Sequence, residues 1–312
     1  MRALVTGGAG FIGSNIVDAL IARGDTVCVL DNLSAGRGVN LTDALANGVE
    51  LVEKSITESD AVADLIASFK PDVIFHLAAQ IDVRKSIDDP SFDSAVNISG
   101  TINLLESARR HGVGRFVFSS TGGAIYGEAD TIPTPEDGDI VPEAPYGQAK
   151  FAAEGYLGLF NRLYGSSTIA LRYGNVYGPR QDPLGEAGVI AIFCGKAMQG
   201  ERPTVFGDGT QTRDYIHVSD VVAANLLAAD SGLTGALNIG AGNETSVLDL
   251  INALSPHATA DFTPIFEPPR LGELPRSALD ASKAKAELGW RPQIEIAPGL
   301  AATLDWARAA IA

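Results

Sequence analysis

Short apolar runs alternate with amphipathic stretches through the first half of the chain. The runs are rich in Val, Ile, Leu and Phe, as buried strands are. The stretches between them repeat apolar residues every three or four positions, which predicts helices. The expected strands span residues 2–6, 26–30, 49–53, 72–77, 115–119 and 168–172, and the expected helices span residues 11–23, 57–69, 91–111 and 146–164.

This alternation predicts an α/β protein with a doubly wound parallel sheet that carries helices on both faces. The rhythm stops after about Tyr173, where glycine and proline become frequent, as in residues 177–180. We therefore expect a sheet domain over residues 1–172 and a smaller, C-terminal α/β substrate-binding domain over residues 173–312. The segment 214–232 is expected to return to the first domain.

Charge and composition limit the classes of partner. The 312 residues carry a formal net charge of −15, and a field of that sign repels nucleic acid and anionic membrane surfaces. No stretch reads as a secretory leader or as a membrane span. The two cysteines, Cys28 and Cys194, match no zinc or redox spacing. We expect a cytoplasmic protein that binds no metal, nucleic acid or membrane.

A glycine pattern follows the first expected strand directly. Gly7, Gly10 and Gly13 have the spacing G-x-x-G-x-x-G between a strand and a helix, which lets the backbone approach a pyrophosphate at the positive end of that helix. Asp31 ends the second strand, where a carboxylate accepts hydrogen bonds from ribose hydroxyls and repels a 2′-phosphate. The pattern predicts a Rossmann fold that binds NAD rather than NADP. In the alternative, Asp31 is a plain surface residue that opens a loop.

Tyr146 and Lys150 form the pattern Y-x-x-x-K on an expected helix. Residues at this spacing share a helix face, so the lysine, together with a positive nicotinamide ring, is expected to lower the pKa of the phenol. A surface pair is the plainer interpretation. The hydroxyls of Ser119, Ser120 and Thr121 end the fifth expected strand, where the ligand crevice of a parallel sheet opens. We favour Thr121 as a proton relay, with Ser120 second and strand-end capping as the alternative role.

Further motifs spread over nearly the whole chain. They are residues 76–80 (HLAAQ), 97–101 (NISGT), 171–180 (LRYGNVYGPR), 213–218 (RDYIHV) and 288–290 (LGW). With the glycine pattern and the Y-x-x-x-K pair, they make the chain resemble the extended short-chain dehydrogenase/reductase family and, within it, the UDP-glucose (UDP-galactose) 4-epimerases. The resemblance implies NAD as the cofactor, a UDP-hexose as the substrate, 4-epimerisation by transient oxidation at C4 with Tyr146 as the base, and a homodimer.

The resemblance also implies roles for individual residues, in which Lys150 binds the nicotinamide ribose and holds Tyr146 ionised. The expected cofactor-binding residues are Gly7, Gly10, Phe11, Ile12, Gly13, Asp31, Asn32, Ser34, Ser55, Ile56, Leu77, Ala78, Ala79, Gln80, Asn97, Ser119, Tyr146, Lys150, Tyr173 and Gly174. The expected substrate-binding residues are Thr121, Tyr146, Asn175, Val189, Phe206, Arg213, Arg270, Arg84 and Arg180. A guanidinium suits a pyrophosphate because it presents a planar fork of donors, although a surface ion pair is the alternative role of these arginines.

The chain departs from the family pattern at several positions. Ser55 stands where an aspartate near the adenine is common. Gly174 stands where a bulkier aromatic is common, which would open space beside the nicotinamide. The pair Gly122-Gly123 lengthens the loop after the serine/threonine run. Outside the motif residues, His76 and His217 are interpreted as packing or hydrogen-bonding residues rather than catalytic ones.

Other functions fit parts of the same pattern. A UDP-glucuronate 4-epimerase would use Arg84 or Arg180 to pair with the sugar carboxylate. A sugar-nucleotide 4,6-dehydratase is disfavoured, because the dehydratases that the chain resembles carry Asp-Glu where it has Gly122-Gly123. A net dehydrogenase or reductase and a non-catalytic NAD-binding regulator are further alternatives, and intact Tyr146 and Lys150 argue against the regulator.

Overall fold

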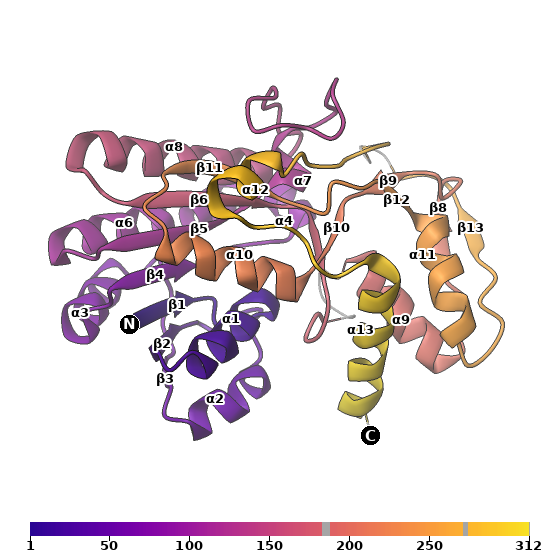
Figure 1. Ribbon diagram of the computed structural model, residues 1–312, viewed down its shortest axis with the longest axis horizontal. Helices are drawn as coiled ribbons and strands as arrows, with labels where there is room; N and C mark the ends of the chain where they lie inside the picture. Colours follow the sequence, from indigo (N-terminus) through magenta and orange to yellow (C-terminus); the bar gives the residue numbers. More distant parts are fainter. Residues whose placement is uncertain (183–187, 271–273, 312) are drawn as a thin grey trace.

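Seven parallel strands form the central sheet of the protein (Figure 1). The structure is a computed structural model, and it describes residues 1–182, 188–270 and 274–311. The strands lie in the order β11-β6-β5-β4-β1-β2-β3, so the carboxyl ends of all seven meet at one edge of the sheet. Their bounds are β1 Arg2–Thr6, β2 Thr26–Leu30, β3 Glu50–Val52, β4 Val73–His76, β5 Arg115–Thr121, β6 Thr168–Tyr173 and β11 Gly235–Ile239.

Helices cover both faces of the sheet, which explains why its strands read as nearly unbroken apolar runs. On one face, α1 (Phe11–Ala22) and α10 (Val218–Asp230) share a buried apolar cluster with the strands. On the other face, α3 (Ser59–Phe69), α6 (Gly100–His111) and α8 (Pro145–Tyr164) enclose a second cluster. The expected doubly wound α/β arrangement is confirmed.

The helix expected over residues 91–111 is divided in the structure. It consists of α5 (Pro90–Ser94), a π-helical stretch η2 (Ala95–Ser99) and α6. A π-helical turn holds one more residue than an α-helical turn and is frequent at functional sites. The shorter elements that sequence periodicity did not predict are η1 Gly38–Leu41, α2 Thr42–Ala46, α4 Val83–Asp88 and α7 Gly122–Ile125.

A smaller part of the chain has its own apolar cluster, built mainly from α9, α11 and α13. In Figure 1 these helices lie to the right of the sheet, with the C-terminus at the end of α13. None of the helices in the described ranges combines the length and the hydropathy that crossing a bilayer needs. The bounds of this part are β7 Asn175–Tyr177, α9 Val189–Gln199, β8 Thr204–Phe206, β9 Thr212–Arg213, β10 Tyr215–His217, β12 Thr245–Ser246, α11 Val247–Leu254, η3 Ser255–His257, β13 Ile265–Glu267 and α13 Ile296–Ile311.

The chain returns to the sheet after it has entered the smaller part. Helix α10 packs against α1, and β11 pairs with β6 as the edge strand. Helix α12 (Ser282–Leu288) then packs against β11. Strand β11 lies beyond the segment 214–232, and its run is interrupted by the polar Asn238. We keep the two-domain division as a proposal, with 235–239 added to the sheet domain.

Candidate active site

The glycine pattern forms the turn between β1 and α1. Gly7 has a φ of +70°, and a Cβ there would lie 2.6 Å from the backbone nitrogen of Ala78. A Cβ at Gly13 would overlap the carbonyl oxygen of Gly7. Gly10 is the N-cap of α1, so the amides of residues 11–13 point out of the helix start. This bare backbone at a positive helix end is the arrangement that a pyrophosphate requires.

Asp31 is buried beside this turn, at the end of β2. Its Oδ2 accepts the amide of Ala9 over 2.9 Å, and its Oδ1 accepts the amide of Leu33 over 2.8 Å. The next residue, Asn32, accepts both the amide and the hydroxyl of Ser34. Each carboxylate oxygen of Asp31 keeps a lone pair for a ribose hydroxyl. Burial at 7% exposure is inconsistent with a plain surface role for Asp31.

The chain after β3 holds two further residues of the expected cofactor set. The hydroxyls of Ser55 and Thr57 lie within hydrogen-bond distance, 2.8 Å. Ile56 is buried, and its carbonyl accepts the side-chain amide of Asn103 over 3.0 Å. A hydroxyl can still serve an adenine as donor or acceptor, so contact of Ser55 with the cofactor stays a prediction.

The chain that leaves β4 lies against the glycine turn. The amide of Ala78 donates to the hydroxyl of Thr6 over 3.2 Å. Asn97, in η2, then clamps the backbone of Gln80 on both sides. Its Oδ1 accepts the Gln80 amide and its Nδ2 donates to the Gln80 carbonyl, each over 2.9 Å. The residues expected on the nicotinamide side are thus fixed to β1 at one end and to η2 at the other.

Both histidines that could suggest catalysis have packing roles. Nδ1 of His76 lies 2.7 Å from the hydroxyl of Thr6, and its Nε2 lies 2.9 Å from the hydroxyl of Thr101. Burial holds the pKa of His76 well below its usual value, so the ring is neutral. His217 caps α10, where its Nδ1 accepts the amide of Ser219. Both residues thus make the hydrogen bonds expected of them, and the absence of a catalytic role stays a prediction.

The start of α8 carries Tyr146, which is partly buried, and Lys150, which is buried one turn later. Nζ of Lys150 donates to the carbonyl of Ser119 over 2.8 Å and lies 4.7 Å from the centre of the Phe118 ring. The amide of Tyr146 donates to the hydroxyl of Ser86 on α4 over 3.2 Å, which fixes the helix start. The pair therefore adjoins the carboxyl end of β5 and is not a surface pair.

Burial shifts the pKa of Lys150 and the pKa of Tyr146 in opposite directions. It lowers the pKa of Lys150 to about 8, against the opposing effect of the carboxylates of Asp93 and Glu154. Burial, with a contribution from the Asp93 charge, raises the pKa of Tyr146 to about 12. Without the cofactor, Lys150 does not outweigh burial, and the expected lowering of the phenol pKa by the lysine and the nicotinamide ring together stays a prediction. A phenolate at neutral pH requires a further positive charge, which a bound cofactor would bring.

The three hydroxyls that end β5 differ in their surroundings. Strand alternation puts Ser119 and Thr121 on one face of the sheet and Ser120 on the other. Ser120 is buried, and its hydroxyl donates to the carboxylate of Glu154, which forms a buried ion pair with Arg172 at 2.7 Å. The hydroxyl of Thr121 bonds to none of the described residues. This geometry agrees with the ranking of Thr121 before Ser120, whose hydroxyl is already bonded to Glu154. The identity of the relay stays a prediction.

The backbone beyond β6 removes the space expected at Gly174. A Cβ at Gly174 would lie 2.8 Å from the carbonyl oxygen of Asp214, so the Asp214 backbone already occupies that room. The preceding residue, Tyr173, is buried, and its hydroxyl lies 2.8 Å from the side-chain nitrogen of Asn225. The expected opening beside the nicotinamide is therefore wrong, and glycine at 174 is required by this close approach.

Residues expected to bind the nucleotide lie on the first turns and strand ends of the smaller part. Phe206 ends β8, and the guanidinium of Arg270 lies 3.9 Å from the centre of its ring. Asn175 begins β7, Val189 begins α9 and Arg213 ends β9. An arginine stacked on an aromatic ring keeps its N–H edge available for an anion.

Two arginines proposed for the sugar carboxylate have different surroundings. Arg180 has a φ of +76°, and its guanidinium forms an ion pair with Asp18 on α1. The side chain of Asn15, also on α1, donates to the carbonyl of Pro179 and helps to hold this loop. Arg180 therefore anchors the loop to the sheet domain through Nη2. Its Nη1 is buried and has no hydrogen-bond partner among the described residues, so its assignment to the substrate stays a prediction. Arg84 is exposed on α4, and its role stays a prediction.

The sequence model of NAD dependent epimerases and dehydratases matches residues 3–240, which include the glycine turn and the Tyr146–Lys150 pair. The chain belongs to this family. A UDP-glucose 4-epimerase from Mycolicibacterium smegmatis is 47% identical over 310 residues, which are 99% of each chain.

Solved structures of family members have the same fold over the full length. A UDP-glucose 4-epimerase from Thermotoga maritima, solved with UDP-glucose, has a TM-score of 0.97 and 46% identity and covers 100% of both chains. A UDP-glucose 4-epimerase from Thermus thermophilus, solved with NAD, has a TM-score of 0.93 and 42% identity over 99% of this chain and 100% of its own.

The residues at the ends of β1 and β2 fit the cofactor that gives the family its name. A pyrophosphate needs close backbone approach, and the added Cβ atoms at Gly7 and Gly13 show that no side chain fits in that turn. Asp31 offers a buried carboxylate next to the turn, where it accepts the amide of Ala9, and at the end of β2, where such folds recognise a ribose. NAD therefore fits the site as the family requires.

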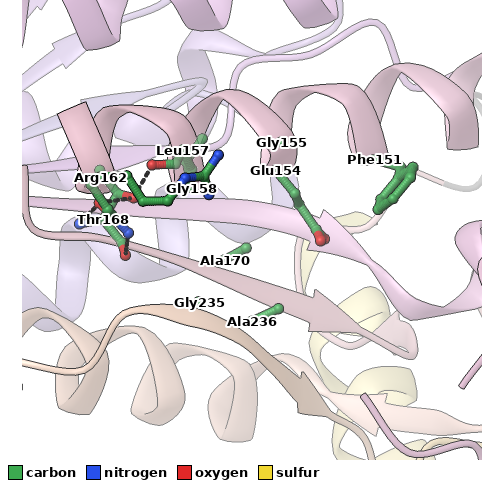
Figure 2. Close-up of a pocket in the computed structure, with 11 residues that line it drawn as sticks. Phe151, Glu154, Gly155, Leu157, Gly158, Arg162, Thr168, Ala170, Gly235 and Ala236 are labelled. Carbon is green, nitrogen blue, oxygen red and sulfur yellow. Dashed lines mark hydrogen bonds between the residues drawn. The ribbon is translucent and has the colours of Figure 1, made fainter. Parts of the chain in front are cut away.

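The hollow shown in Figure 2 lies elsewhere on α8. It has a volume of about 270 Å³ between α8 and the strands β6 and β11, and Glu154 and Thr168 are among its lining residues. Neither Tyr146 nor Asp31 lines it, so it is not the reaction site. Within residues 1–182, 188–270 and 274–311, no three His, Cys, Asp or Glu side chains gather where a metal ion could be held.

Sequence reasoning missed the carboxylates around Tyr146 and Lys150. Glu154 lies one turn beyond Lys150 on the same helix, and Asp93 precedes Asn97 by four residues, so spacing places each on the relevant helix face. Acidic residues at helical spacing are usually solvated, which is why the pattern did not single them out. Burial at 1% exposure distinguishes Asp93, and only the structure provides it.

Proposed function

We propose that the protein is an NAD-dependent UDP-glucose 4-epimerase that interconverts UDP-glucose and UDP-galactose. The observation that carries the proposal is the position of Tyr146 and Lys150. They adjoin the end of β5, and Lys150 is bonded to Ser119. Two residues further along the strand lies the hydroxyl of Thr121, which bonds to none of the residues that the structure describes. This arrangement supplies a base, a cation and a relay at the crevice where a parallel sheet binds its ligands.

Tyr146 is the base that takes the proton of the sugar 4-hydroxyl, with Thr121 as the relay. Lys150 keeps its charge at neutral pH because its pKa is about 8, and this charge favours the phenolate when the cofactor is bound. When bound, NAD would supply the hydride chemistry at C4, by which a hydride leaves the sugar and is restored on its opposite face. Tyr146 then gives the proton back, so no net redox change occurs.

The smaller part of the protein would hold the nucleotide while the sugar reacts and rotates. Arg213 and Arg270 would bind the diphosphate, and Phe206 offers a ring to the uracil. Anchoring through the nucleotide leaves the sugar free to rotate about its diphosphate linkage and to present its other face. The same anchoring keeps the 4-keto sugar from leaving before the hydride returns.

Product analysis tests this proposal directly. Purified protein is incubated with UDP-galactose, UDP-glucose, UDP-N-acetylglucosamine and UDP-glucuronate in turn, and the C4 configuration of each product is determined by NMR. We expect interconversion of UDP-glucose and UDP-galactose without net NADH formation. Turnover of none of the nucleotide sugars, or stoichiometric NADH formation, would overturn the proposal.

The same assay separates the alternatives. Turnover of UDP-glucuronate in preference to UDP-glucose would identify the glucuronate enzyme, for which exposed Arg84 remains a candidate carboxylate partner. A 4-keto-6-deoxy product would identify a dehydratase, against which Gly122-Gly123 argues. NAD binding without any turnover would identify a regulator.

The protein is further expected to be a cytoplasmic homodimer that uses the helices at residues 91–111 and 146–164. Apolar exposure on these elements supports the interface: Phe92 is 42% exposed, Leu163 61% and Tyr164 51%. Light scattering at micromolar concentration should give twice the chain mass of 32.5 kDa. A mass of one chain would remove this part of the proposal.

A further inference from the structure

Asp93 is a buried carboxylate with an incomplete set of hydrogen bonds. It lies on α5 at 1% exposure. Its Oδ1 accepts the side-chain amides of Gln80 and Asn97, each over 2.9 Å. Its Oδ2 is buried and has no hydrogen-bond partner among the described residues. Neutral amides compensate a buried charge only in part, so a cation nearby is expected to stabilise it.

Lys150 is a cation whose charge acts on the Asp93 carboxylate. Helix α5 packs directly against α8, which carries Lys150. Burial raises the pKa of Asp93, and the hydrogen bonds from Gln80 and Asn97 and the Lys150 charge oppose that rise. The Asp93 charge in turn opposes the effect of burial on Lys150 by raising its pKa. Each charge therefore stabilises the ionised form of the other residue across the interface between α5 and α8.

The hydrogen bonds of Asp93 reach the cofactor side of the site as well. Gln80 and Asn97 form the clamp that fixes the chain beyond β4, and both side-chain amides converge on Oδ1 of Asp93. Loss of this oxygen would release the clamp from α5. Loss of the charge alone would leave the clamp intact and change only the electrostatics at Tyr146 and Lys150.

We propose that Asp93 is a positioning residue of the reaction, whose buried carboxylate fixes the Gln80–Asn97 clamp and sets the pH range in which the Tyr146–Lys150 pair works. The inference deepens the proposed function, on which its kinetic test rests. Because the Asp93 charge favours protonated forms of both neighbours, its removal moves both titrations to lower pH.

Other charged groups around α5 and Lys150 do not replace Asp93. On α8, Glu154 also raises the pKa of Lys150, but it is paired with Arg172. On β4, His76 is neutral. On α4, Arg84 and Lys85 are exposed, and Lys85 lies over the Phe92 ring. Element η2 contributes Asn97, which does not titrate.

The substitution Asp93→Asn separates the charge from the hydrogen bonds. Its amide oxygen can keep both bonds of Oδ1, and its NH₂ group takes the place of Oδ2, which has no partner to lose. The kinetic readout is the pH profile of kcat/KM for the nucleotide sugar that the wild-type protein turns over. We expect the acidic limb and the alkaline limb of this profile both to move to lower pH by about one unit. The matched control, Asp88→Asn, removes one exposed charge at the end of α4 and should leave the profile unchanged.

A profile for Asp93→Asn that superimposes on the wild type, even with a lower maximum, would overturn the proposal and leave Asp93 with a merely structural role. A second measurement needs neither turnover nor this variant. The carboxyl of Asp93 is titrated by ¹³C NMR in the wild type and in Lys150→Met. We expect its pKa to rise in Lys150→Met, and an unchanged value would also refute the proposal. Should the wild type turn over no nucleotide sugar, the proposed function fails and this titration alone decides on Asp93.

Discussion

The ammonium of Lys150, one helical turn after Tyr146, donates a hydrogen bond to the backbone carbonyl of Ser119 near the carboxyl end of strand β5. This bond fixes the ammonium against the sheet at the carboxyl end of β5, where the ligand crevice lies. The chemistry proposed for the protein depends on that attachment, because it sets the position of the phenol relative to the cofactor and the sugar.

Removal of the phenolic hydroxyl should abolish turnover. Tyr146→Phe keeps the ring and the start of α8 but has no proton to exchange, and we expect kcat to fall by a factor of about 10³ or more. NAD affinity, measured by calorimetry, should change less than about threefold. The matched control is Tyr156→Phe on the exposed side of the same helix, which should retain full activity. Comparable activity in the two variants would contradict the assignment of the base.

The two hydroxyl candidates should respond differently to substitution. Thr121→Val removes a hydroxyl that bonds to none of the described residues, and we expect kcat to fall about 10²-fold with little change in stability. Ser120→Ala removes a donor to the buried Glu154 carboxylate, so we expect a loss of about 1–3 kcal/mol in the free energy of unfolding and kcat within a few-fold of wild type. Steady-state kinetics and urea unfolding check both. The reverse pattern would make Ser120 the relay.

Asp31 should decide between NAD and NADP. In Asp31→Ser, the ribose loses its charged carboxylate acceptor, and the repulsion of a 2′-phosphate disappears. We expect NAD to bind about 10–100-fold more weakly and NADP to bind at least as well as before. Fluorescence titration with both nucleotides measures the ratio. Glu53→Gln, which removes an exposed charge just beyond β3, serves as the control and should not alter it. An unchanged preference in Asp31→Ser would remove the residue from cofactor recognition.

Asp214 should impart a distinctive pH dependence to stability. Burial raises its pKa to about 6, although the carboxylate accepts the amides of Ala241, Gly242 and Leu279. The folded protein therefore binds more protons than the unfolded chain between about pH 4 and pH 6. The contribution of Asp214 to stability is full below pH 4 and is lost as the pH rises through 6.

Asp214→Asn tests that linkage by urea unfolding across pH 4 to 7. The free energy of unfolding of the wild type relative to the variant should rise by about 2–3 kcal/mol as the pH falls over this range. The variant should also be less stable at pH 7 by about 1–3 kcal/mol, because an amide nitrogen cannot accept the backbone donors. A difference that is independent of pH would show that the carboxyl does not titrate in this range.

The sheet and its cofactor end could be predicted from the sequence because their signals are local. Strand β1, the turn at Gly7 and the start of α1 follow one another without interruption, and each has a steric reason to be there. The four-residue spacing of Tyr146 and Lys150 likewise predicts a shared helix face. Strand β11 escaped prediction because Asn238 interrupts its apolar run, and that side chain bonds to distant carbonyls, including that of Thr134.

The surroundings of the reactive groups could not be predicted in the same way. Whether a lysine lowers the pKa of a nearby phenol depends on how far both are buried, and burial is a property of the whole fold. The pairing of Arg180 with Asp18 joins residues 162 positions apart. The role of Ser120 depends on which face of β5 it occupies and on Glu154 opposite it. Each of these relationships is set by tertiary packing rather than by spacing along the chain.

Transfer of an isotopic label at C4 tests the central claim most directly, namely that the sugar is oxidised and reduced again within one binding event. The protein is incubated with UDP-glucose that carries deuterium at C4, and the UDP-galactose formed is analysed by NMR. The account predicts that the product keeps the deuterium at C4 with inverted configuration. Formation of UDP-galactose with hydrogen from solvent at C4, or no UDP-galactose at all, would contradict it.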